Sequence, residues 1–470
     1  MTNFKVGGKT LLEIGYPKSP VFRTAIKVMD EHFSHLTRDE VIAVLKNVLA
    51  DPAAYTDDPL LGQIAAQLMM PVAPAEIALR EIPVPYAVFG KEHIADGAIQ
   101  QLQNAVRLPV AVAGSLMPDG HQGYGLPIGG VLAADNAVIP YGVGVDIGCR
   151  MCLSILDLPV QSLLANDDVY KQQLMNFTKF GAGVEWKKRE ADPVLERKEF
   201  KEIKFIKNLF DKAAGQLGTS GSGNHFVEWG IATISDAQNE WGLVPGDYVA
   251  LLSHSGSRGL GAQIAGHYTQ VAKDLCPLPE KVRHLAYLDL NSEAGQEYWL
   301  AMNLAGDYAS ACHHLIHKRL IQAMGATLLA RVENHHNFAW KEMYEGKEVI
   351  VHRKGATPAG KGVLGVIPGS MTAPGFIVRG KGEVTSLQSA SHGAGRLMSR
   401  TMAQKSITDQ QLKQVLQDNG VTLIGGGLDE APGAYKDINT VMAAQTGLVE
   451  VIGSFVPKVV RMADGGPPED

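Results

Sequence analysis

Six short polar segments, most of them rich in glycine, hold chemically active side chains at a higher density than a tight turn requires. They occupy residues 119–125, 144–149, 221–228, 253–259, 333–337 and 391–396 of the 470-residue chain. Each places Asp, Asn, Glu, His, Cys or Arg where the backbone can bend sharply, usually after an apolar run that is typical of a strand. Loops on a rigid sheet are common places for binding groups. We expect these segments to meet at one site.

Metal binding is one chemistry that these residues support. The candidate ligands are Asp146, Cys149, His225, His254 and either His335 or His336. An Asp and a Cys three positions apart in a glycine turn can face the same ion, and a thiolate can bridge two ions. Carboxylate, thiolate and imidazole together suit Zn, Fe, Co or Mn, so the ligand types alone leave the metal open.

Phosphate binding is a second chemistry that the same segments support. Residues 218–224 and 391–396 offer runs of backbone N–H groups that can form anion-binding nests, although neither segment is a Walker motif. His392 has small neighbours and is followed closely by Arg396. A neutral imidazole beside an anion site can attack phosphorus and form a phosphoramidate.

Apolar runs and helical patterns predict the elements that position these segments. Strands are expected near residues 108–117, 247–253, 347–353 and 375–380, with a long helix over about 293–324. Further helices are expected over 96–106 with Asp96 as the cap, across the charged stretch 160–215, and from Thr408 to Asn419.

Residues 1–85 read as a helical N-terminal extension without evident chemistry, and residues 86–470 as the domain that holds the site. Apolar spacing predicts a helix that begins near Ser19 or Pro20, and a capping box from Thr37 to Glu40 predicts a second helix over 38–49. The C-terminal GGPPED, residues 465–470, is expected to fray.

The composition excludes several classes of protein. A chain that is 45% hydrophobic and 20% charged is not disordered, and no apolar run approaches the ~20 residues of a membrane span. The N-terminus lacks a signal-peptide core, and four cysteines are too few for a disulfide framework, so we expect a cytoplasmic protein with no membrane partner. The net charge of −6 means that any polyanion must bind at a local basic groove.

Nine motifs occur in the order found in one known family. They are DGHQGYGLPIGGV, GVGVDIGC, GSGNHFVE, HSGSRGLG, NHHNFAW, HRKGA, IPGSM, SHGAGR and EAPGAYKD. In these motifs the chain resembles the RtcB-type RNA ligases over about residues 86–461. The resemblance implies an α+β fold of layered mixed sheets flanked by helices. It also implies an enzyme that uses GTP and Mn²⁺ to join RNA 3′-phosphate or 2′,3′-cyclic phosphate ends to 5′-hydroxyl ends.

The resemblance also implies roles for individual residues. Cys149 would bridge two Mn²⁺ ions, with Asp146 and His225 on one ion and His254 and His336 on the other; His336 is chosen because it directly precedes Asn337. His392 would be the histidine that takes GMP covalently. The guanylate site would comprise Asn224, Glu228, Ser370, Ala394, Gly395, Tyr435 and Arg461.

Three features depart from the family pattern. Arg150 follows the metal cysteine where the family usually has glycine, residues 372–376 differ in part of the nucleotide pocket, and Arg461 replaces a lysine. We expect Arg150 to pack away from the metals and to engage an RNA phosphate or a carboxylate, because two dications would repel it.

A ligase would bind RNA along a local basic surface, and cations inside the motif loops are the candidates for it: Arg258, Arg353, Lys354 and Arg396. Two alternative functions remain open at this point. One is a Mn²⁺-dependent phosphoesterase that acts on RNA ends without guanylate transfer. The other is a non-catalytic protein that binds RNA ends.

Overall fold

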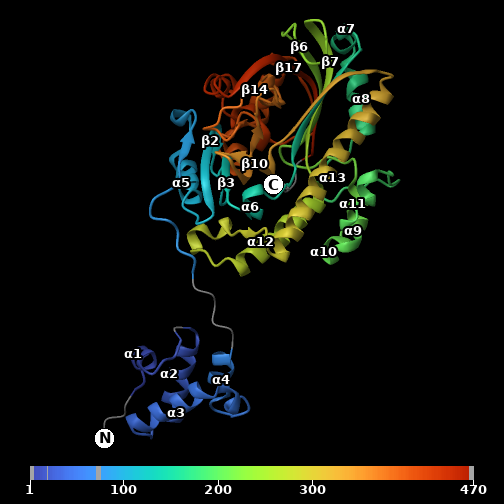
Figure 1. Cartoon of the computed structure of the whole chain (residues 1–470). Coiled ribbons are helices and arrows are strands. Elements are labelled where there is room, and N and C mark those ends of the chain that lie inside the picture. The colour runs from blue at the N-terminus through green and yellow to red at the C-terminus, as the bar shows by residue number, and fades with distance from the viewer. Residues whose placement is uncertain (1–4, 18, 70–75, 465–470) are drawn as a thin grey trace. The chain divides into compact units, whose positions relative to one another are not determined.

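The chain forms two compact units, which are shown in a computed structural model (Figure 1). The structure describes residues 5–17, 19–69 and 76–464, and the predicted frayed tail lies outside these residues. The units are Met1–Ala75 and Glu76–Asp470. The boundary predicted from the sequence, after residue 85, is ten residues C-terminal to the boundary between these units.

The N-terminal unit is helical, as the sequence predicts. Its helices are α1 (Gly8–Glu13), α2 (Val21–His32), α3 (Arg38–Ala50) and α4 (Gly62–Met69). The capping box is confirmed, since Thr37 and Glu40 cap α3 reciprocally. Buried apolar residues such as Leu11, Val21 and Leu45 form a core that contains only residues of this unit.

The largest sheet of the second unit is nearly closed and is antiparallel except for one short strand, β16, which pairs in parallel. Within the described residues its strand order is β13-β14-β17-β6-β7-β5-β9, with β16 paired to β17. The strands are β5 (Arg150–Leu156), β6 (Phe226–Ile234), β7 (Gly246–Ser255), β9 (Leu328–His335), β13 (Leu364–Ile367), β14 (Gly375–Gly380), β16 (Thr422–Ile424) and β17 (Val449–Met462).

One side chain joins the two ends of this strand order. Asn334 of β9 accepts a hydrogen bond from Val366 N of β13 at 2.8 Å and donates one to Val366 O at 3.2 Å. The amide thereby satisfies backbone groups of an edge strand in the manner of a neighbouring strand. Met151, Leu252 and Phe455 belong to the apolar core that packs on the inside of the sheet.

A second sheet lies beside the first. Its order is β1-β2-β3-β11-β10, formed by β1 (Tyr86–Val88), β2 (Ala111–His121), β3 (Ile128–Ala134), β11 (Lys347–Lys354) and β10 (Asn337–Tyr344). Two short pairs complete the strands of the described residues: β4 (Ala137–Val138) with β8 (Leu288–Asp289), and β12 (Ala356–Pro358) with β15 (Ser389–Ser391). These layers confirm the predicted α+β class.

Helices flank the sheets, and the long α13 runs beside α12 (Figure 1). Outside the N-terminal unit the α-helices are α5 (Asp96–Ala105), α6 (Pro140–Val143), α7 (Val160–Ala165), α8 (Asp167–Phe177), α9 (Glu199–Glu202), α10 (Lys204–Lys207), α11 (Phe210–Gln216), α12 (Arg258–Leu275), α13 (Glu293–Ala323), α14 (Arg400–Ser406), α15 (Asp409–Asn419) and α16 (Ile438–Ala443). None in the described ranges is both long and apolar enough to cross a membrane.

Two predictions about helices need correction. The stretch 160–215, predicted to be helical, is a series of short helices, and it contains no α-helix between Phe177 and Glu199. Asp96 is the first residue of α5 and the cap position belongs to Ala95, so Asp96 contributes its charge to the first turn instead of a capping hydrogen bond.

The ends of four neighbouring strands bring the predicted site together. Cys149 directly precedes β5, His225 directly precedes β6, and His254 lies near the end of β7. Arg150, the residue after Cys149, pairs with His335 at the end of β9. Because antiparallel neighbours run in opposite directions, the starts of β5 and β6 and the ends of β7 and β9 meet at one edge of the sheet.

The separate core of the N-terminal unit leads to a prediction about stability. Leu45→Ala should destabilise that unit by about 2–5 kcal/mol, because it removes a fully buried side chain of α3. All five tryptophans, residues 186, 229, 241, 299 and 340, lie in the second unit. Urea unfolding followed by circular dichroism should therefore show an earlier helical transition, while the tryptophan fluorescence transition stays in place. The exposed Lys46→Ala in the same helix is the control, and a shift of both transitions in Leu45→Ala would contradict separate cores.

Candidate metal and nucleotide site

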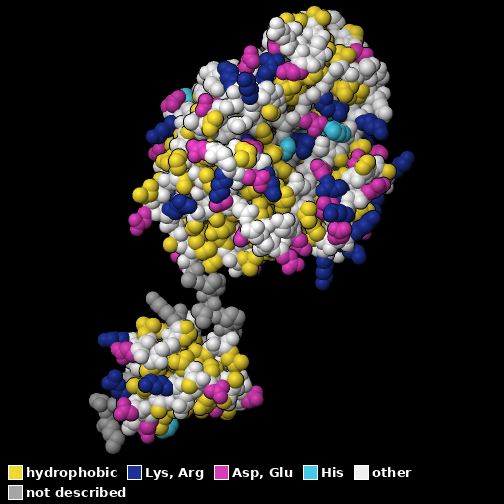
Figure 2. All heavy atoms as spheres, viewed as in Figure 1, with side chains coloured by type: hydrophobic (Ala, Val, Ile, Leu, Met, Phe, Trp, Pro, Cys, Tyr) yellow, Lys and Arg dark blue, Asp and Glu magenta, His cyan; other side chains and the backbone are white. Residues whose placement is uncertain are grey.

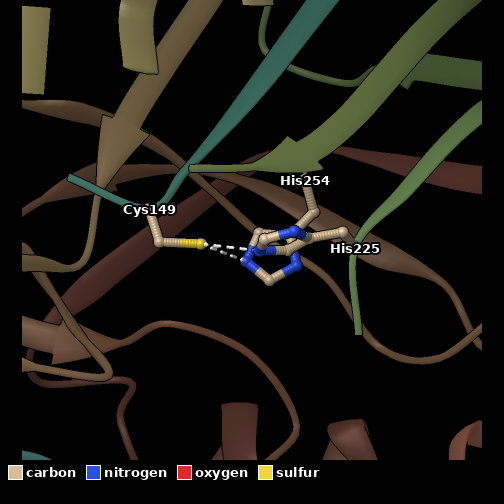
Figure 3. A group of neighbouring side chains, drawn as sticks. All are labelled: Cys149, His225 and His254. Atoms are coloured by element: carbon tan, nitrogen blue, oxygen red, sulfur yellow. Dashed lines mark hydrogen bonds between the residues drawn. The ribbon is translucent and has the colours of Figure 1, made fainter. Parts of the chain in front are cut away.

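A thiol and three imidazoles form the centre of the site. Cys149 Sγ lies 3.2 Å from His254 Nε2 and 3.5 Å from His225 Nε2, and the two rings point toward the sulfur (Figure 3). His254 Nε2 is also 3.1 Å from His336 Nε2. All four side chains are buried. Of the two candidates at 335 and 336, the structure brings His336 to the cluster, whereas the ring of His335 packs against Phe338.

Asp146 adds a carboxylate to this cluster. Its Oδ2 lies 3.1 Å from His225 Nε2, and its Oδ1 accepts a hydrogen bond from Ser257 N at 3.0 Å. Burial favours the neutral acid, but the hydrogen bond and charge of His225 outweigh it and lower the pKa of Asp146 to about 2. The carboxylate is therefore ionised at neutral pH and available as a ligand.

The imidazoles of His254 and His336 are held in the neutral form that binds metals. Burial, together with the charge of His225, lowers the pKa of His254 to about 3, and burial lowers the pKa of His336 well below its usual value. His254 Nδ1 donates to the carbonyl of Asn224 at 3.0 Å, which leaves the Nε2 lone pair facing the sulfur. A carboxylate, a cysteine and neutral imidazoles that converge within hydrogen-bond distance form a donor set suited to a divalent transition metal.

His392 lies next to this donor set and is oriented by a residue that the sequence analysis did not assign. Its ring centroid is 4.9 Å from that of His336. Its Nδ1 is 2.7 Å from Oδ2 of the fully buried Asp119, and its backbone N donates to the same oxygen at 3.1 Å. Asp119 stands in the first polar segment, but nothing in the sequence pairs it with a residue 273 positions away. With Nδ1 engaged, Nε2 is the ring nitrogen available for chemistry.

A pocket of about 240 Å³ contains this cluster and most of the predicted nucleotide-site residues. Its walls include Asn224, Glu228, Ser370, Ala394, Gly395 and Tyr435. Ala373, from the segment that departs from the family pattern, also lines it.

Two of these residues show how the pocket is organised. Glu228 is almost completely buried, and burial raises its pKa well above the usual value, so it presents a neutral carboxyl to the pocket. Tyr435 donates its hydroxyl to Glu430 and lies under the Arg396 guanidinium, 5.2 Å from it. A wall with polar groups and apolar neighbours is typical of a ligand pocket.

Arg461 lies outside the pocket, contrary to the predicted nucleotide role. Arg461 stands between Val460 and Met462 in β17, and both of these neighbours line the pocket. Successive strand residues point to opposite faces of a sheet, so Arg461 faces α8 instead. There its Nη1 donates to the carbonyls of Leu174 and Thr178.

Arg150 packs away from the cluster of candidate metal ligands. Its expected partner was an RNA phosphate or a carboxylate, and in the structure it binds a carboxylate. Its Nη1 lies 3.0 Å from Glu333 Oε2, and its Nη2 donates to Gly306 O of α13 at 2.9 Å. Burial alone would raise the pKa of Glu333, but hydrogen bonding and charge from His314, together with Arg150, hold it well below the usual value. Arg150 is buried and therefore is not an RNA contact.

The four predicted RNA-contacting cations divide into two pairs. Arg258 and Arg353 are 2% and 1% exposed, so the prediction that they contact RNA is wrong: Arg258 binds Gly181 O, and Arg353 forms a bidentate pair with Glu342. Lys354 and Arg396 line the pocket, and burial lowers the pKa of Lys354 to about 7. Lys and Arg mix with Asp and Glu on the visible face of the second unit (Figure 2).

A second buried group of possible ligands lies behind the first. Cys152, His313 and His317 have ligand atoms within 4.8 Å of one another. The ring nitrogens are already hydrogen bonded, however. His313 Nδ1 and His317 Nε2 lie 2.6 and 2.8 Å from Ser253 Oγ, and His313 Nε2 donates to Ser255 O. Burial also lowers the pKa of both histidines. This group is a polar network that joins α13 to β7.

The nearly closed sheet carries a buried Cys–His–Asp cluster in the wall of a pocket, which defines a protein with a metal-type donor set at a ligand site. Comparison with known proteins identifies the family. The family model described as tRNA-splicing ligase RtcB matches residues 101–463. The chain therefore belongs to the RtcB family, and it is an RNA ligase.

Individual relatives agree with the family model. The RNA-splicing ligase RtcB of Escherichia coli (strain K12) is 34% identical over 386 residues, which covers 76% of this chain and 91% of that protein. The tRNA-splicing ligase RtcB of Methanococcus maripaludis is 32% identical, covering 74% of this chain and 88% of its own length. The RNA-splicing ligase RtcB of Mycobacterium tuberculosis is 30% identical, covering 76% and 98%.

The burial of Arg150 predicts a structural effect of its substitution. Arg150→Met should lower the free energy of unfolding by about 2–4 kcal/mol, because Glu333 keeps its charge but loses a buried partner. Denaturant titration measures this loss. Arg189→Met, which breaks an exposed pair with Asp211, is the control and should cost about 0.5 kcal/mol or less. The salt dependence of RNA binding should not change in Arg150→Met, and a shallower slope would show that Arg150 reaches RNA.

Proposed function

We propose that this chain joins RNA 3′-phosphate or 2′,3′-cyclic phosphate ends to 5′-hydroxyl ends, using GTP and Mn²⁺, through a histidine–GMP intermediate. The observation that carries the proposal is the position of His392, whose Nδ1 is held by Asp119 while its ring lies beside His336 in the pocket. A histidine held in one tautomer next to metal-type ligands is suited to attack phosphorus.

The donor set supports a site for two cations. Cys149 Sγ lies between the two neighbouring pairs, Asp146 with His225 and His254 with His336, so it is placed to bridge one ion held by each pair. When bound, such ions neutralise phosphate charge and stabilise in-line displacement at phosphorus.

From a 3′-phosphate end, the proposed reaction has three displacements at phosphorus. A 2′,3′-cyclic phosphate end is first opened by water, which attacks phosphorus while the bond to the 2′-oxygen breaks and that oxygen takes up the proton. His392 Nε2 attacks the α-phosphorus of GTP, so that a P–N bond forms while the bond to the pyrophosphate oxygen breaks. An oxygen of the RNA 3′-phosphate next attacks the same phosphorus, which breaks the P–N bond and releases the histidine. The RNA 5′-hydroxyl then loses its proton and attacks the 3′-phosphate phosphorus, and GMP leaves. The buried Glu228 supplies a neutral carboxyl that can hydrogen bond to the base.

The placement of Arg461 favours a second candidate function. Because that side chain faces α8, it adds nothing to recognition of a base in the pocket. A Mn²⁺-dependent phosphoesterase that opens cyclic phosphates without guanylate transfer would need no base recognition. Labelled GTP separates the two functions, since only the ligase retains label on the denatured protein.

Substitution of His392 tests the nucleophile. His392→Ala should abolish covalent labelling by GTP and the joining of 3′-phosphate ends, while Mn²⁺ binding persists because the ring is not in the donor set. The variant should still seal RNA that already carries a 3′-terminal guanylate, since that displacement does not use the P–N bond. The exposed His93→Ala, a histidine that does not line the pocket, is the matched control. A folded His392→Ala protein that takes label from GTP would reject the assignment.

Calorimetric titration with Mn²⁺ tests the bridging thiolate. Cys149→Ala should lose binding at both positions, because a bridging sulfur belongs to both ions, whereas His225→Ala should lose mainly one. The buried Cys312→Ala, in α13, is the control and should bind both ions. Equal losses in Cys149→Ala and His225→Ala would remove the bridging role.

A further inference from the structure

Three aromatic rings meet at the entrance of the pocket, and the mechanism above does not use them. The ring centroid of Tyr124 lies 6.4 Å from that of Tyr141 and 5.8 Å from that of His284, and the last two are 4.9 Å apart. Tyr124 is 67% exposed, which is unusual for a large aromatic side chain that already has two ring neighbours. We call these three residues the aromatic platform.

The loop that carries Tyr124 is fastened on both sides. Gln101 accepts a hydrogen bond from Gly123 N at 3.0 Å and donates one to Gly123 O. Lys354 Nζ donates to the carbonyl of Tyr124 at 2.6 Å. Gly125 has a φ of +71°, and a Cβ there would lie 3.1 Å from His284 O, so glycine lets the loop pack against that residue. The backbone thus holds an exposed ring in place before any ligand binds, which reduces the entropy lost on binding.

Two rings of the aromatic platform line the reaction pocket, and a lysine amine lies against one of them. Tyr124 and Tyr141 line the same pocket as His392. Lys354 Nζ lies 4.7 Å from the centroid of the Tyr141 ring. The charges acting on His284 are mainly positive, from Lys273, Lys354 and Arg283 against one carboxylate, and with burial they lower its pKa.

We propose that the aromatic platform stacks the unpaired terminal base of an RNA strand and so presents its phosphate or hydroxyl end to His392 and the donor set. Aromatic side chains interleaved with cations bind single-stranded nucleic acid by stacking on bases and neutralising phosphates. A fastened, exposed ring at the pocket entrance fits a base that arrives from outside. Every base has a flat face, so the platform accepts ends of any sequence. This inference rests on the proposed ligase function.

Fluorescence of 2-aminopurine tests the platform without catalysis. The probes are single-stranded RNA 10-mers with 2-aminopurine at the terminal nucleotide, one bearing a 3′-phosphate and one a 5′-hydroxyl at that end. The full-length protein is titrated into each probe in the presence of Mn²⁺ and the absence of GTP. Binding should quench the fluorescence of one of the two probes, and that probe identifies the RNA strand whose terminal base stacks on the platform. Tyr124→Ala should weaken its binding about 10-fold or more, since stacking on a protein ring contributes strongly for each base. Tyr124→Phe should bind within about twofold of the unmodified protein, because it keeps the ring.

Two further arms make the outcome decisive. An RNA 10-mer with an abasic terminal nucleotide, measured by competition against the fluorescent probe, should bind the unmodified protein more weakly by the same factor as Tyr124→Ala. The two losses should not add, because they remove the same contact. Tyr86→Ala removes a partly exposed ring outside the pocket and should have no effect. The platform would be overturned if the losses from the abasic nucleotide and from Tyr124→Ala added. It would also be overturned if Tyr124→Ala bound RNA as tightly as the unmodified protein, or if that substitution changed only the affinity for GTP. The titration contains no GTP and is therefore independent of the GTP labelling test. A protein that takes no label in that test but binds RNA through Tyr124 would reject the ligase mechanism and retain the platform.

Discussion

The antiparallel register of β5, β6, β7 and β9 is the constraint on which the rest of the site depends. It brings Cys149, His225, His254 and His336 to one edge of the sheet from segments far apart in the chain. Because the edge is buried, the pKa values of His254 and His336 are lowered, and the lone pairs of these two imidazoles remain available. A shift of one residue in any of these pairings would turn the corresponding ligand to the opposite face. The hydrogen bonds of Asn334 to β13 keep the sheet nearly closed around its apolar core and so maintain that register.

A buried polar network supports this edge from behind. The network comprises, in order, Arg331, Ser154, His317, Ser253, His313 and the carbonyl of Ser255. The carbonyl of Ser255 can only accept, so His313 donates to it through Nε2 and, as a neutral ring, accepts at Nδ1 from Ser253. Because the single proton of Ser253 is used, His317 also donates through Nε2, and both imidazoles carry their proton on that nitrogen. The carbonyl at its end directly follows His254. The network therefore links α13 to the end of β7, where His254 joins the cluster of candidate metal ligands. Every ring nitrogen of His313 and His317 is used in a hydrogen bond, so none is left to bind a metal at this second group.

The pocket combines two environments that suit successive steps on phosphorus. At its inner end, Asp119 orients His392 beside His336, and Glu228 remains neutral in an apolar wall. At its entrance, Lys354 offers an amine that hydrogen bonds to the loop, and the aromatic platform offers flat faces. Under the proposed function, a nucleotide bound at the inner end and a strand bound at the entrance would meet at the same imidazole.

The sequence by itself determined the types of group present, the order of the motifs, the α+β class and the local helix signals. The capping box of α3 and the strands β7, β11 and β14 follow from short-range patterns that need no distant partner. Only the tertiary structure decided that Asp119 holds His392 across 273 positions, that Arg150 binds Glu333, and that Arg461 turns to α8. Those outcomes depend on which face of a strand a side chain occupies and on which strand lies next to it. Pairing over such distances is set by the packing of whole sheets, and no local spacing encodes it.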